Sequence, residues 1–219
     1  MIRRHYFLKS RMQKKKRVIN VTLEKIKLDI AIAEKSMAEL KLDTVVSELD
    51  LLCEIYCLTP FNWQSFYLKV FDGEEYTLLY AKPYYKDFLG NESVSTSFGM
   101  TLEAENHPTC RGKIFCGIKK LCKDNTTINK ILDCLPKKNV SDANRGVCID
   151  GITTMIVNNK MNPSTSLYFR TGAKFLRNSY TQEQVDFLEN LHSHIEEIIG
   201  NLRATDKSYV CFREMHIDS

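Results

Sequence analysis

Glycine is scarce in this sequence, with nine residues among 219. A loop that cradles phosphates uses closely spaced glycines, because its backbone must approach the ligand. Neither such a loop nor a G-X-S-X-G nucleophile elbow is present. The sequence also lacks a run of 18 apolar residues, so no membrane-spanning helix is expected. No apolar signal segment follows the first residues, and we therefore expect a soluble, cytoplasmic protein.

Positive charge is concentrated at the N-terminus. Residues 1–17 contain eight Lys or Arg and no acid, although the formal net charge of the whole sequence is only +4. Residues 18–219 therefore carry a formal charge of −4. A mildly acidic body does not indicate nucleic-acid binding, and only the basic tail offers a weak contact for phosphates.

Eight cysteines are present, and without a secretory signal we interpret them as reduced thiols. Structural zinc sites usually show paired ligands two to four residues apart. Among the cysteines of residues 107–134, only Cys110 approaches that spacing, together with His107. We therefore predict neither a metal site nor a cofactor.

An apolar heptad pattern runs through residues 19–40. Spacings of four and three alternate between Ile19, Leu23, Ile26, Ile30, Ala33, Met37 and Leu40. This pattern predicts a helix, and two interpretations remain open: the helix packs on its own domain, or it pairs with a second copy as a coiled coil.

The apolar stripe restarts out of step after Leu42, which predicts a kink, stutter or break near Asp43-Thr44, followed by more helix. Thr59-Pro60 would end this helical region, because proline disfavours the helical conformation in the residue before it. The restarted stripe consists of Val46, Leu49, Cys53 and Tyr56.

Two apolar runs flank Asp72-Gly73 and predict a β-hairpin. Asp-Gly favours a two-residue type I′ turn, which needs positive φ at both central residues. With that turn, one face of the hairpin would hold Phe66, Leu68, Val70, Thr77 and Leu79. The other face would hold Tyr67, Phe71, Tyr76, Leu78 and Tyr80. Both faces are apolar and must be covered, one by helices and the other by loops or a ligand pocket.

The rest of the chain alternates polar loops with short elements. Residues 83–112 are irregular and are candidates for pocket-covering loops. We expect a brief helix around 128–132, strands at 146–157 and 164–170, and one extra strand at 209–215. Thr181 and Gln184 form a capping-box pattern that opens a helix reaching Leu202.

Three stretches resemble the GAF domain family of small-molecule-sensing modules. Residues 42–52 resemble the helix leading into the first strand, residues 62–73 the first hairpin, and residues 180–188 the opening of the closing helix. The resemblance implies an α+β fold whose central antiparallel sheet carries the N- and C-terminal helices on one face and a pocket on the other. The resemblance covers a GAF-like domain at residues 42–202. Together with the charge and heptad patterns it divides the chain into a basic tail (1–17), a helical segment (18–41), that domain and a second tail (203–219).

This resemblance implies a non-enzymatic sensory or regulatory module. It would be a homodimer paired through helices 19–40 and 181–202. An unidentified small molecule would bind on the pocket side, at Trp63, Tyr67, Cys116, Gly117, Cys148 and Asp150.

Two alternatives remain open. Residues 62–68 also resemble free methionine-(R)-sulfoxide reductases, whose chemistry needs an attacking thiolate and a resolving thiol. Such an enzyme would use Cys110, Cys116 and Cys148. The other alternative is a protein-interaction module without a cavity, which an interior filled with side chains would favour.

Overall fold

A computed structural model describes residues 26–59, 65–86, 92–94, 111–141, 151–200 and 210–214. Its strands are β1 (Asp50–Leu58), β2 (Phe66–Asp72), β3 (Tyr76–Lys86), β4 (Glu92–Val94), β5 (Arg111–Leu121), β6 (Val140–Ser141), β7 (Thr153–Asn158), β8 (Thr165–Arg170) and β9 (Val210–Glu214). Its helices are the segment 26–39, α2 (Leu42–Val45), α4 (Thr126–Asp133), the 3-10 helix η1 (Lys174–Asn178), α5 (Gln182–Glu189) and α6 (Leu191–Gly200).

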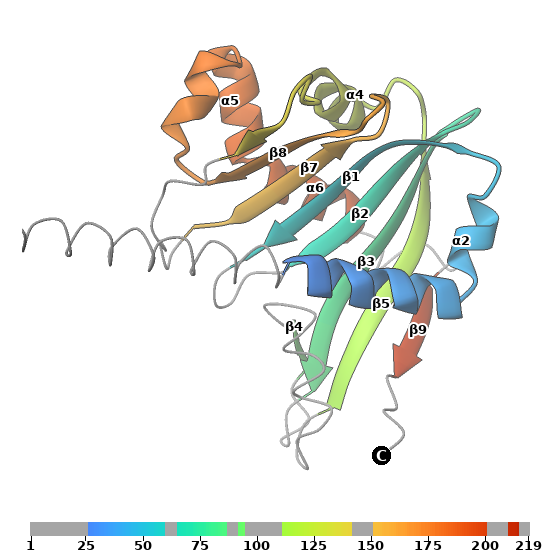
Figure 1. Cartoon of the computed structure of the whole chain (residues 1–219). Coiled ribbons are helices and arrows are strands. Elements are labelled where there is room, and N and C mark those ends of the chain that lie inside the picture. Colours follow the sequence, from blue (N-terminus) through green and yellow to red (C-terminus); the bar gives the residue numbers. More distant parts are fainter. Residues whose placement is uncertain are drawn as a thin grey trace, which may run out of the picture.

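The described strands form one sheet in the order β6-β8-β7-β1-β2-β3-β5-β9, with β4 paired to β3 (Figure 1). Every neighbouring pair is antiparallel except β6 with β8. The predicted α+β class with a central, mostly antiparallel sheet is therefore confirmed. Within the described part of the chain, no helix is long and apolar enough to cross a membrane.

Helices cover both faces of this sheet. We call the face that holds Tyr56, Tyr67 and Cys116 the front face; the segment 26–39 and α2 pack on it. The back face is covered by α4, η1, α5 and α6. The prediction that the N- and C-terminal helices share one face is therefore wrong. Each helix brings one apolar stripe to a sheet with two apolar faces, and placing one group of helices on each face buries both.

From residue 26 onward, the apolar residues of the heptad pattern pack against the sheet of the same chain. Ile26, Ala33 and Met37 are almost completely buried in the cluster on the front face. This agrees with the first interpretation, a helix packing on its own domain. Ile19 and Leu23 lie outside the described residues, and the homodimer stays a prediction.

The prediction of helix through residues 46–56 is wrong, because Asp50–Leu58 is the strand β1. Its side chains alternate between the faces, with Ile55 and Cys57 in the back cluster and Tyr56 in the front cluster. A strand covered on both faces has a nearly continuous apolar sequence, which also contains helical spacings. Periodicity alone therefore could not distinguish the two.

The hairpin exists, but its turn is longer than predicted. Phe71 pairs with Thr77 and Val70 with Leu78, so five residues separate the last paired positions. This register puts Leu78 and Tyr80 on the back face, with Val70 and Leu68, rather than on the face of Tyr67. The longer turn keeps Glu74 and Glu75 exposed to water, whereas a two-residue turn would place them in the ladder.

Several local predictions are confirmed. The brief helix is α4, the predicted strand 164–170 is β8, and the extra strand is β9. The predicted strand 146–157 is confirmed only from Thr153, where β7 begins; residues 146–150 lie outside the described residues. The capping box is present: the Thr181 hydroxyl accepts from the Gln184 backbone N–H, and the Gln184 side chain accepts from the Thr181 N–H. The closing helix is interrupted at Asn190, which separates α5 from α6.

Gly117 offers a test of the packing on the back face. It lies directly opposite Tyr80 in the β3–β5 ladder, and a Cβ atom at Gly117 would stand 2.4 Å from the Tyr80 hydroxyl oxygen and 2.6 Å from Cζ. We expect Gly117→Ala to lower the free energy of unfolding by about 1–3 kcal/mol, because the buried ring must move. Urea denaturation measures this change.

Gly151→Ala is the matched control, because a Cβ there meets only the Thr171 hydroxyl, at 4.0 Å. Its effect should stay within about 0.5 kcal/mol. Equal effects of the two substitutions would contradict the close approach of the Tyr80 ring to the β5 backbone.

Candidate functional site

The structure describes three of the residues predicted to bind a ligand. Tyr67 and Cys116 lie on the front face, and each has an exposed fraction of 0%. Gly117, the next residue of β5, faces the Tyr80 ring on the back. These three residues therefore do not line one common opening. The remaining predicted site residues lie outside the described residues: Trp63, Cys110, Cys148 and Asp150.

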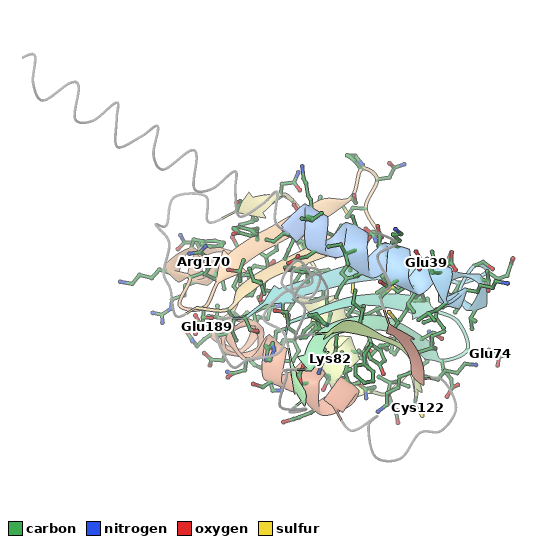
Figure 2. The ribbon with its side chains drawn as sticks, turned by 90° about the horizontal axis from the view of Figure 1, so that it is seen from below. Glu39, Glu74, Lys82, Cys122, Arg170 and Glu189 are labelled. Atoms are coloured by element: carbon green, nitrogen blue, oxygen red, sulfur yellow. The ribbon has the colours of Figure 1, made fainter. Side chains whose placement is uncertain are left out.

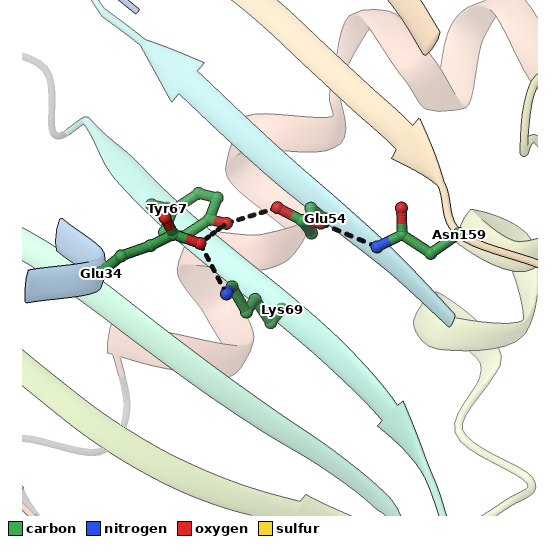
Figure 3. Close-up of polar contacts among 5 residues, drawn as sticks. All are labelled: Glu34, Glu54, Tyr67, Lys69 and Asn159. Carbon is green, nitrogen blue, oxygen red and sulfur yellow. Dashed lines mark hydrogen bonds and ion pairs between the residues drawn. The ribbon is translucent and has the colours of Figure 1, made fainter. Parts of the chain in front are cut away.

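A polar network surrounds the Tyr67 hydroxyl (Figure 3). This hydroxyl donates to Oε2 of Glu54 at 2.5 Å, and Oε1 of Glu34 lies 3.3 Å away. Lys69 pairs with Glu34 at 2.7 Å, and the Asn159 amide donates to Glu54 at 2.7 Å. Burial and the Glu54 carboxylate raise the pKa of Tyr67 well above its ordinary value of 10.0, so the phenol remains a proton donor.

A second phenol and carboxylate join the helix 26–39 to the sheet. The Tyr56 hydroxyl donates to Oδ2 of Asp29 at 2.5 Å, and both residues have an exposed fraction of 0%. Burial, followed by the Asp29 charge, raises the pKa of Tyr56 well above its ordinary range. Together with the contact between Glu34 and Tyr67, this bond fixes the position of the helix on the front face.

The back face has its own polar groups beside α6. The ammonium of Lys82, which is labelled in Figure 2, lies 2.7 Å and 3.0 Å from the two carboxylate oxygens of Glu196. The buried His192 ring stacks on Phe66, with the ring centroids 5.5 Å apart. Sequence reasoning missed the pair of Lys82 and Glu196, because the two residues are 114 positions apart and only the fold brings them together.

The buried thiols are poor nucleophiles. Burial raises the pKa of Cys53 and of Cys57 from 9.0 to about 12, and that of Cys134 to about 11. The thiolate is the reactive form, so these three thiols are almost entirely protonated near neutral pH. In the part of the chain that the structure describes, no group of three His, Cys, Asp or Glu side chains could hold a metal ion.

The described geometry defines an α+β protein in which Tyr67 and Cys116, two of the predicted ligand residues, are part of the core. Comparisons with protein-family models, with curated proteins and with solved structures found no match. The functional argument therefore depends on the contacts within this chain.

Removing the Tyr56 hydroxyl should lower the free energy of unfolding more than removing the Tyr67 hydroxyl. We expect Tyr56→Phe to lower the free energy of unfolding by about 1.5–3 kcal/mol, since Asp29 is buried and the bond is to a charged group. Tyr67→Phe should cost less, about 0.5–1.5 kcal/mol, because Glu54 keeps its Asn159 partner and Glu34 is partly exposed. Urea denaturation of both variants tests the order, and a larger cost for Tyr67→Phe would contradict it.

The raised thiol pKa values also predict alkaline instability. Above pH 9.0 the unfolded chain ionises at Cys53 and Cys57, whereas the folded chain keeps both thiols protonated up to about pH 12. The unfolded state is then favoured, so the free energy of unfolding should be unaffected by these thiols below pH 9 and should fall above it. The slope approaches about 1.4 kcal/mol per pH unit for each thiol.

Urea denaturation between pH 8 and pH 10 measures this slope. Cys57→Ala removes one of the two thiols and should make the decline shallower. An unchanged slope in that variant would show that Cys57 ionises equally in both states.

Proposed function

We propose that the protein is a non-enzymatic protein-interaction module. One observation carries this proposal: the face on which a ligand pocket was expected is occupied by the helix 26–39 and α2, and Tyr67 and Cys116 are fully buried beneath them. Within the described residues, buried side chains therefore stand where a ligand was expected, which favours an interaction module over a small-molecule sensor.

The polar groups of the front face support the same proposal. A ligand site needs a few polar groups that are available to a ligand. The Tyr67 hydroxyl and the Glu54 carboxylate instead bond to each other and to Glu34 and Asn159. This arrangement stabilises the helix 26–39 on the sheet.

A part of the front face offers a surface for a protein partner. On β7 and β8 the front residues Met155, Val157, Ser166 and Tyr168 are partly exposed, whereas Ile156, Leu167 and Phe169 on the back of the same strands are buried. We call this surface the open half-face; it consists of Met155, Val157, Ser166 and Tyr168. Aromatic residues and Met are enriched at protein interfaces, and Tyr168 and Met155 pair with each other across the two strands.

Native mass spectrometry of the gently purified full chain, with a thiol count on the same sample, tests the proposed function. We expect no bound small molecule and no thiol pair that turns over methionine sulfoxide. A retained small molecule would overturn the proposal in favour of the sensor, and sulfoxide-dependent oxidation of two thiols would overturn it in favour of the reductase.

The surface is tested with a matched pair of charged substitutions. Val157→Lys introduces a charge on the open half-face beside Glu54, its neighbour in the β1–β7 ladder. Met161→Lys introduces the same charge at an exposed position in the turn between β7 and β8. Any protein complex of the full chain, including a homodimer, should weaken at least tenfold with Val157→Lys and persist with Met161→Lys. Equal behaviour of the two variants would exclude the open half-face as the binding surface.

A further inference from the structure

Two cysteines that are 95 positions apart in the sequence lie directly opposite each other in the sheet. β5 and β9 are antiparallel neighbours, and Cys116 is the register partner of Cys211. The pair lies within a ladder of five consecutive partners without a register shift, running from Lys113 with Glu214 to Gly117 with Val210. The position of Cys211 opposite Cys116 is therefore fixed by its neighbours on both sides.

This position suits a disulfide bond. Directly opposed residues of an antiparallel pair have Cα atoms about 4.5–5.5 Å apart and belong to the same face of the sheet. Disulfides usually join Cα atoms about 4.4–6.8 Å apart. The register therefore places Cys116 and Cys211 within disulfide reach without rearrangement of the strands.

We propose that Cys116 and Cys211 are a reversible redox pair that links the C-terminal strand β9 to β5. The oxidant is a small disulfide of the glutathione class. This inference is independent of the proposed function, because it concerns the attachment of one strand and not the binding of a partner. It also gives Cys116 a different thiol partner from the Cys110 and Cys148 of the predicted reductase.

The reaction is two successive thiol–disulfide exchanges. The Cys211 thiolate attacks one sulfur of the small disulfide, which forms a mixed disulfide and releases one small thiol. The Cys116 thiolate then attacks the Cys211 sulfur and releases the second small thiol. The two cysteines lose two protons and two electrons, and the small disulfide becomes two thiols. Cys116 has an exposed fraction of 0% and so cannot meet the small disulfide first, which leaves the first attack to Cys211.

The link would control the attachment of the last strand. β9 pairs only with β5 among the described strands, so it is held by one ladder of five residue pairs. A covalent bond within that ladder keeps β9 in register when its hydrogen bonds open, and reduction releases this constraint. The attachment of β9 to β5 would therefore depend on whether the surroundings oxidise or reduce the two cysteines.

The test oxidises the native full chain with glutathione disulfide, blocks the remaining thiols and digests it with trypsin. We expect the tryptic peptides 114–119 and 208–213 to be joined, with the loss of two hydrogen masses, and to separate on reduction. Backbone amides of residues 210–214 should exchange hydrogen at least tenfold more slowly in the oxidised chain than in the reduced chain.

Two serine variants serve as a matched pair. Cys211→Ser should abolish the joined peptide and the redox dependence of hydrogen exchange, and it keeps the buried Cys116 intact. Cys122→Ser removes an exposed cysteine, near the end of β5 (Figure 2), and should leave the joined peptide unchanged. Linkage of Cys116 to Cys110 or Cys148, or the absence of any link to Cys211 under oxidation, would overturn the proposal.

Discussion

The structure depends on one constraint: the central sheet is apolar on both faces, and each face must be removed from water. β2 illustrates this, since Phe66, Leu68 and Val70 belong to the back cluster while Tyr67 and Phe71 belong to the front cluster. Burial of apolar surface is the main favourable contribution to folding, so neither face can remain open over the central strands. The helices 26–39 and α2 cover one face, and α4, α5 and α6 cover the other.

Polar groups decide how the front helix sits on the sheet. Apolar contacts are not directional, so they allow a helix to shift along a flat surface. Asp29 accepts a bond from Tyr56, and Glu34 accepts bonds from Tyr67 and Lys69; together these bonds define one position. The back face has a comparable contact, in which Lys82 meets Glu196 of α6. Tyr67, which was predicted to bind a ligand, is therefore part of the core.

The two proposals concern strands toward the two ends of the described sheet. The open half-face lies on β7 and β8, where Met155 and Tyr168 are only partly buried against the front cluster, and β9 forms one end of the described strand order. Edges and partly covered faces are where a sheet can gain further contacts. Partner binding is thus proposed for β7 and β8, and the redox-dependent attachment for β5 and β9.

The sequence by itself determined the capping box at Thr181, the brief helix α4 and the apolar character of both hairpin faces, because these depend on neighbouring residues. The α+β class was predicted from a family resemblance rather than from a local pattern. It could not decide between helix and strand for Asp50–Leu58, since a strand buried on both faces has no alternating pattern. Only the tertiary structure decided which face each helix covers, the register that turns Leu78 to the back, and the meetings of Tyr56 with Asp29 and of Cys116 with Cys211. These contacts join residues far apart in the chain, and local sequence carries no signal for them.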